Sequence, residues 1–148
     1  MVLVIPPIRS PHDCWLLLAS LAVLVFGATN ASAYDVSAGD YHTCALDDNG
    51  VTCWGLNDHS QTAVPVGLVN PSAMATGGDH TCALDDNGVT CWGRNIEDQT
   101  MVPAGLVNPS AVAAGSFHTC ALDDNGVSCW GRNSEGQTAG PASLMNPS

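Results

Sequence analysis

The chain has 148 residues and a formal net charge of −11, with three arginines and no lysine against 14 acidic residues. A protein needs a basic surface to neutralise nucleic-acid phosphates or to bind an anionic membrane, so both partners are excluded. Hydrophobic residues make up 45% of the chain and charged residues 11%, which excludes an intrinsically disordered chain. The length is that of one domain, on the usual figure of about 150 residues.

The N-terminal residues 1–33 are predicted to be a secretory signal peptide. Arg9 and His12 precede an apolar run over residues 14–27, and Ala31-Ser32-Ala33 forms a small-residue cleavage site. A permanent membrane anchor is the alternative, but the run is shorter than the ~20 residues that span a bilayer. We therefore expect a mature chain that begins at Tyr34 and is secreted, periplasmic or held at the cell surface.

Residues 34–148 are predicted to form one domain of three repeats with a period of 38 residues. The repeats cover residues 35–72, 73–110 and 111–148, and the segment HTCALDDNGVTCWG recurs in each with the single change Ser128. The same period separates three marker residues of each repeat: His42, His80 and His118; Trp54, Trp92 and Trp130; Gln61, Gln99 and Gln137. A fixed period of this length indicates a repeat architecture.

Each repeat is predicted to contain a β-hairpin. In the first repeat, residues 42–46 and 51–55 flank Asp-Asp-Asn-Gly, which is a strong hairpin signal. The turn places Leu46 opposite Val51 and Cys44 opposite Cys53. Strand alternation then puts two sets of side chains on opposite faces: His42, Cys44, Leu46, Val51 and Cys53 on one, and Thr43, Ala45, Thr52 and Trp54 on the other.

Further short extended segments at residues 36–38 and 62–64 suggest about four strands per repeat. Since four-stranded units at a fixed period are typical of propeller blades, we predict an all-β fold, a partial β-propeller of three four-stranded repeats. Propellers have about four to eight blades, so three repeats leave outer faces uncovered, with Val36, Trp54 and Leu144 exposed. The chain is then expected to form a homodimer or to be a fragment of a longer repeat protein.

The six cysteines of residues 34–148 are predicted to form three disulfides within the hairpins. Cross-strand neighbours lie at a distance that a disulfide can bridge, and an even number of cysteines in an exported chain favours oxidation. The expected pairs are Cys44–Cys53, Cys82–Cys91 and Cys120–Cys129. The alternative is a zinc site built from His42, Cys44 and Cys53 and from their repeats, although the spacing matches no known zinc module.

The repeat also resembles that of a known family. Its pattern is most complete in the third repeat, at Ala114-Gly115, His118 to Leu122, Gly126-Val127, Cys129 to Gly131, Asn133 and Glu135-Gly136-Gln137. This pattern is similar to the repeat of the regulator of chromosome condensation family, in its short bacterial, secreted, cysteine-containing form. Ser60 and Asp98 depart from it at the position of Gly136, which is expected to lie in a turn. The resemblance implies a propeller whose histidines are structural and hydrogen-bonded in the blade, and whose faces bind proteins.

Two sets of residues have a functional interpretation that competes with a structural one. The three tryptophans could line a ligand groove, but one tryptophan at the same place in every blade is more simply core. The six turn carboxylates could attract Ca²⁺, yet Asp, Asn and Gly are also what a tight turn requires. No catalytic constellation stands out from the repeat, so we predict no enzyme, no cofactor and no metal site.

The segments that differ between the repeats are the predicted binding surface. They lie at the end of the hairpin away from the Asp-Asp-Asn-Gly turn and are called here the loop face: residues 40–41, 56–60, 78–79, 94–98, 116–117 and 132–136. Variable loops on a constant frame commonly build the recognition surfaces of repeat proteins, although drift in unimportant loops explains the variation equally well. The candidate binding residues are Tyr41, Asp58, His59, Asp79, Arg94, Ile96, Glu97, Asp98, Phe117, Arg132, Ser134 and Glu135.

The sequence thus predicts a secreted, non-catalytic binding module that recognises a protein or a cell-envelope component through the loop face. The alternative is a calcium- or zinc-binding protein, or an enzyme, that uses the repeated Asp or His/Cys sets.

Overall fold

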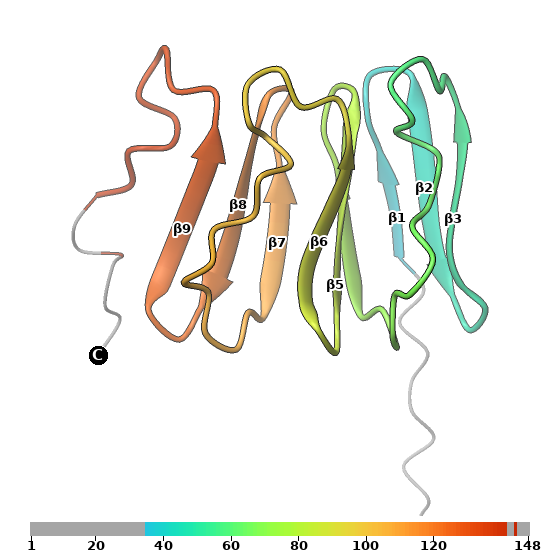
Figure 1. The fold of residues 1–148 in the computed structure, drawn as a ribbon, viewed down its shortest axis with the longest axis horizontal. Helices are drawn as coiled ribbons and strands as arrows, with labels where there is room; N and C mark the ends of the chain where they lie inside the picture. The colour runs from blue at the N-terminus through green and yellow to red at the C-terminus, as the bar shows by residue number, and fades with distance from the viewer. Residues whose placement is uncertain (1–34, 142–143, 145–148) are drawn as a thin grey trace, which may run out of the picture. The chain divides into compact units, whose positions relative to one another are not determined.

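A computed structural model describes residues 35–141 and 144, so the predicted signal peptide and Tyr34 lie outside the described residues. Each repeat supplies one sheet, with strand orders β1-β2-β3, β4-β5-β6 and β7-β8-β9, and the three sheets stand side by side in Figure 1. The strands are β1 (Asp35–Ala38), β2 (His42–Asp47), β3 (Gly50–Gly55), β4 (Ala73–Thr76), β5 (His80–Asp85), β6 (Gly88–Gly93), β7 (Ala111–Ala114), β8 (His118–Asp123) and β9 (Gly126–Gly131). No helix in this part of the chain has the length and apolar character of a membrane span.

The hairpins have the predicted register. Leu46 is paired with Val51 and Cys44 with Cys53, and the ladder extends one step further, to Asp47 and Gly50. Gly50 has a φ of 103°, a conformation that glycine adopts without strain, and the same is true at the equivalent turns. The turn chemistry therefore fixes which residues of the hairpin face each other.

The predicted fourth strand at residues 62–64 is wrong, because each described sheet has three strands. The segment instead forms tight turns, in which the Ala63 amide donates to the Ser60 carbonyl and the Val64 amide to the Thr62 carbonyl, both at 3.1 Å. Ser60 has a φ of 63°, which reverses the chain just before the segment. Pro65 follows it and has no N–H to donate to a ladder.

The sheets stack face to face, with β4 against β1 and β2 and with β7 against β4 and β5. The faces alternate as predicted, because Cys44 and Leu46 are buried against Met74 of the next sheet. Every residue of β5 is buried, since the middle sheet is covered on both sides. The predicted all-β, partial-propeller architecture is confirmed.

Glycines permit the close approach of consecutive sheets just before the first two hairpins. A Cβ atom on Gly77 would lie 2.5 Å from the carbonyl oxygen of Gly115, in the next repeat. Real Cβ atoms do not come so close to a backbone oxygen, so any side chain here would push the two sheets apart.

The prediction that the tryptophans are core is right for two of the three. Trp92 and Trp130 are 8% and 7% exposed, whereas Trp54 is 52% exposed. Trp54 is exposed because it lies on the outer face of the β1–β3 sheet, which no other sheet of the described residues covers. Val36 and Leu144, also expected on uncovered faces, are 69% and 47% exposed.

Candidate functional site

A short chain of hydrogen bonds connects the first repeat to the second. The Thr81 hydroxyl donates to the main-chain carbonyl of Gln61 at 3.0 Å and accepts from Nε2 of His42 at 2.9 Å. The indole N–H of Trp92 donates to the same carbonyl at 3.0 Å. The hydroxyl has one hydrogen, and that hydrogen is used on Gln61, so His42 carries its proton on Nε2. We call this set of contacts a joint.

The second joint, between repeats two and three, reproduces the first. His80 donates to the Thr119 hydroxyl, which donates to the Gln99 carbonyl, and the Trp130 indole donates there as well, each at 2.9 Å. His42 and His80 are thus hydrogen-bonded, as the family resemblance implies, and their partners lie in the following repeat. The same residue types at the same spacing build the same joint twice.

Burial in the joints keeps the histidines neutral. Burial lowers the pKa of His80 to about 4, and the neighbouring rings of His42 and His118 act in the same direction. Burial also lowers the pKa of His42, against the opposing influence of Asp79 and Asp40. A neutral ring with its proton on Nε2 matches the hydrogen bond to threonine, so these histidines have a structural role.

The loop face gathers at one end of the stack, as predicted. In each repeat one main-chain hydrogen bond of 2.9 Å connects its two variable segments: Leu56 to Tyr41, Arg94 to Asp79, and Arg132 to Phe117. These loops lie at the top of Figure 1, where the arrow of β9 ends. The variable residues therefore share a surface on a constant frame.

Two arginines of the loop face lie over the same aromatic ring. The guanidinium carbons of Arg94 and Arg132 lie 5.5 Å and 5.6 Å from the ring centroid of Phe117, within cation–π range. Arg94 also forms a 3.1 Å ion pair with Asp79, and Nε of Arg132 donates to the Ser134 hydroxyl at 2.8 Å. Five of the twelve predicted binding residues thus meet in one cluster, which we call the arginine cluster. It contains every cation of residues 34–148.

The other candidate residues form no side-chain hydrogen bond, ion pair or cation–π contact with this cluster among the described residues. Tyr41 and Ile96 are 70% and 71% exposed and present apolar surface on the loop face. His59, Glu97 and Glu135 donate their main-chain N–H to the side chains of Gln61, Gln99 and Gln137, which shapes the loops. Asp58 and Asp98 are exposed, and Asp98 has a φ of 59°.

The acidic turns at the opposite end use their carboxylates internally. Asp85 accepts from the amides of Val69 and Asn87, at 2.9 Å and 2.8 Å, and Asp86 accepts from the Asn70 side chain at 2.7 Å. Asp123 makes the equivalent bonds to Val107 and Asn125. This arrangement is that of turn and loop stabilisation, as the structural interpretation of Asp-Asp-Asn-Gly predicts.

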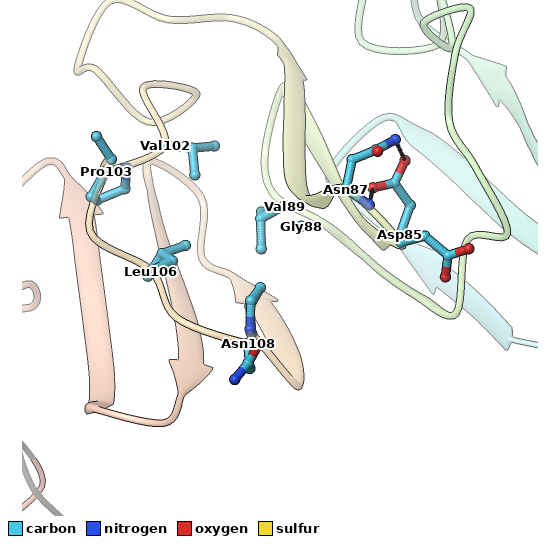
Figure 2. Close-up of a pocket in the computed structure, with 11 residues that line it drawn as sticks. Asp85, Asn87, Gly88, Val89, Val102, Pro103, Leu106 and Asn108 are labelled. Carbon is cyan, nitrogen blue, oxygen red and sulfur yellow. Dashed lines mark hydrogen bonds between the residues drawn. The ribbon is translucent and has the colours of Figure 1, made fainter.

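A cavity of about 420 Å³ lies beside one of these turns, between the β5–β6 turn and the loop at residues 102–109. Figure 2 shows Val89, Val102 and Leu106 around it, with the Asp85 carboxylate held by Asn87. This cavity could not be predicted from the sequence, because its lining residues come from two segments that only the fold brings together.

The cysteines form the predicted disulfides, Cys44–Cys53, Cys82–Cys91 and Cys120–Cys129. A sulfur that is bonded to another sulfur is not a thiolate ligand, which argues against the zinc alternative. Within residues 35–141 and 144, no three His, Cys, Asp or Glu side chains lie close enough together to hold a metal ion.

Sequence reasoning identified the glutamines and threonines of the joints only as repeat markers or strand residues. Gln61 and Gln99 are fully buried although they are polar, and so are Thr81 and Thr119. The signal that could have found them was the recurrence of Gln at a fixed spacing in an otherwise exposed loop.

Stacked three-stranded sheets connected by identical joints define a repeat protein of the β-propeller class. The family model for the regulator of chromosome condensation (RCC1) repeat matches residues 34–61, 72–99 and 110–137. The chain belongs to this family, whose members are typically binding or exchange-factor proteins. A search of curated proteins found no match.

Solved structures from plants share this fold. The ectodomain of the Physcomitrella patens receptor kinase CR4 is 27% identical, with a TM-score of 0.57 over 68% of this chain and 29% of its own. The CRINKLY WD40 ectodomain of the Arabidopsis thaliana receptor kinase ACR4 is 30% identical, with a TM-score of 0.56 over 69% of this chain and 38% of its own.

A yeast structure shares the fold as well. Prp20p from Saccharomyces cerevisiae, described with its binding to Gsp1p and histones, is 22% identical, with a TM-score of 0.62 over 76% of this chain and 34% of its own. This identity is low enough that the likeness shows the fold alone. The chain spans about a third of the length of these three structures.

Proposed function

We propose that the protein is an exported, non-catalytic binding module that recognises a protein or a cell-envelope component through its loop face. The observation that carries the proposal is the arginine cluster. In a chain with a net charge of −11, the two arginines of residues 34–148 lie over the same ring, that of Phe117. Arginine and aromatic residues are the types that most often dominate binding energy at interfaces.

The geometry of the cluster supports a particular kind of contact. Asp79 forms an ion pair with Arg94, while Arg132 is exposed, and the only hydrogen-bond partner of its side chain among the described residues is Ser134. The remaining guanidinium donors of Arg132 match a carboxylate on a partner, which arginine binds in a bidentate manner. Exposed Tyr41 and Ile96 add apolar area to the loop face.

A protein with the same fold, the disulfides and the hydrogen bonds of the repeated residues support the other parts of the proposal: protein binding, export and the absence of catalysis. Prp20p binds Gsp1p and histones, so this fold can present a protein-binding surface. Three disulfides are compatible with an oxidising compartment outside the cytoplasm. The hydrogen bonds of His42 and His80 in the joints and of the turn aspartates support a structural role for both sets, in line with a binding module.

The test compares capture by wild-type protein and by loop-face variants. The purified exported protein is immobilised and exposed to envelope and medium fractions of the producing organism, and bound species are identified by mass spectrometry. We expect Arg132→Ala and Phe117→Ala to weaken binding of a captured species about tenfold or more, the size of a hot-spot loss.

Val66→Ser is the matched control, because Val66 is fully exposed and lies outside the loop face. It should leave the affinity unchanged. Equal capture by wild type, Arg132→Ala and Phe117→Ala would refute the role of the loop face, whatever the identity of the bound species.

A further inference from the structure

The two ends of the stack expose the residues that the joints bury. At the first repeat, Trp54 is 52% exposed, against 8% and 7% for Trp92 and Trp130. At the third repeat, Leu122 is 42% exposed, against 2% and 6% for Leu46 and Leu84. Each end is therefore one half of a joint without its other half in the described residues.

The first half, on the outer face of the β1–β3 sheet, contains the hydrogen-bond donors. Thr43 and Trp54 occupy the positions of Thr81 and Trp92 and are directly paired across β2 and β3. Val36 lies on the same face, in the position of Met74, and is 69% exposed. We call this surface the Thr/Trp end.

The second half, on the outer face of the β7–β9 sheet, contains the acceptor and the histidine. His118 and Gln137 occupy the positions of His42 and Gln61, and both are more exposed than the fully or nearly fully buried residues of the formed joints. The side chain of Gln137 already accepts from the Glu135 amide at 2.8 Å, so its loop has the conformation seen in the joints. We call this surface the His/Gln end.

We propose that a second copy of this chain docks head to tail, with its Thr/Trp end on the His/Gln end of the first copy. The two halves are complementary because each formed joint already pairs them, with matching partners and distances of 2.9–3.0 Å. In the new joint, His118 donates to the Thr43 hydroxyl of the second copy, and that hydroxyl and the Trp54 indole donate to the Gln137 carbonyl. Apolar contact between Val36 and Leu122 replaces the contact that Met74 makes with Leu46.

The interface is heterologous, since different surfaces of the two copies meet. Such contacts form either a closed ring or an open chain of copies. Two copies that close a ring would share six repeats, within the range of about four to eight blades of known propellers. This inference is independent of the loop face, which lies on a different side of each repeat.

The test blocks one end at a time. Trp54→Asp places a charge in the Thr/Trp end and Leu122→Asp in the His/Gln end, and both side chains are exposed, so the substitutions leave the repeat core intact. We expect wild-type protein to be an oligomer by light scattering at micromolar concentration. Each single variant should be monomeric, with a dissociation constant raised at least about tenfold by the loss of a buried anchor.

An equimolar mixture of the two variants provides the decisive measurement. Each variant keeps one intact end, so the mixture should form a 1:1 heterodimer through a single joint. Ile96→Asp, at an exposed apolar position on the loop face, should oligomerise like wild type. A monomeric wild type, oligomeric single variants, or a mixture without heterodimers would each overturn the proposal. A monomeric wild type would mean that residues of its own chain cover the ends, and would leave the test of the arginine cluster unaffected.

Discussion

The indole N–H of Trp92 donates to the main-chain carbonyl of Gln61 at 3.0 Å, across the boundary between the first two repeats. The same carbonyl accepts from Thr81, so two donors of one repeat converge on one oxygen of the preceding repeat. A carbonyl oxygen has two lone pairs, and this one uses both inside the protein. The joint is thus a specific polar contact inside an apolar stack, which orients one sheet on the next.

Removing the hydroxyl from a joint should destabilise the fold. Thr81→Val keeps the shape of the side chain but leaves the N–H of His42 without its partner in a buried site. We expect a loss of about 1–3 kcal/mol in the free energy of unfolding, measured by urea denaturation. Thr43→Val is the matched control, because Thr43 has no hydrogen bond to another repeat among the described residues. At concentrations where the chain is monomeric, equal losses in the two variants would contradict the joint.

Acid should weaken the protein through its buried histidines. Burial lowers the pKa of His80 to about 4, below that of an unfolded histidine, so the unfolded chain binds more protons between these values. The contribution of His80 is therefore complete above pH ~6.5 and is lost as the pH falls toward 4, on the order of 3 kcal/mol in total. Urea denaturation from pH 7.5 to 4 measures the loss. His80→Gln should show a shallower pH dependence than wild type, and parallel curves would refute this role of His80.

Each disulfide should contribute on the order of 2–3 kcal/mol by restricting the unfolded chain. The double variant Cys82→Ala/Cys91→Ala should lower the free energy of unfolding by this amount while the other two bridges persist. Peptide mapping without reductant checks the pairing first. Six free thiols, or bridges between different repeats, would be incompatible with it.

Replacing Asp98 by glycine should stabilise the loop that follows the second hairpin. Asp98 has a φ of 59° and Gly136, at the same position of the third repeat, has a φ of 78°. Left-handed backbone costs a residue with a Cβ about 1–2 kcal/mol, and glycine avoids this cost while losing more chain entropy. We expect Asp98→Gly to raise the stability by up to about 1 kcal/mol in thermal or urea unfolding. Asp58→Gly, in the equivalent loop of the first repeat but without positive φ, should be neutral or destabilising.

The exported protein should begin at Tyr34, because Ala31-Ser32-Ala33 is a small-residue cleavage site after an apolar run. Intact-mass measurement of protein recovered outside the cytoplasm checks this boundary. Full-length chain recovered with the membrane fraction would contradict it.

Local features could be predicted from the sequence, while contacts between repeats could not. The pairing of Cys44 with Cys53 follows from the turn and from strand alternation, which involve only neighbouring residues. The partner of His42 lies 39 residues away, and the sequence alone does not say which surfaces of consecutive sheets meet. The contact of Arg94 with Phe117 also connects two consecutive repeats, so the sequence indicated the loop face but not the arginine cluster within it.

The error over the fourth strand has a related cause. Residues 62–64 have β-compatible composition, but Gln61 just before them directs its carbonyl into the joint. That requirement, together with the left-handed Ser60 and the following proline, selects turns over an extended segment. A tertiary contact thus overrides local propensity.

The disulfides all close within single repeats, and none crosses a joint. Each disulfide closes one hairpin covalently, whereas consecutive repeats are held together by hydrogen bonds, apolar contact and the connecting chain. Under mechanical load or heat, the contacts between repeats should therefore break before the hairpins unfold. A repeat at one end of the stack should detach while its hairpin remains intact. Such a molecule should unfold in discrete steps of one repeat. Each step can reverse without breaking or forming a disulfide.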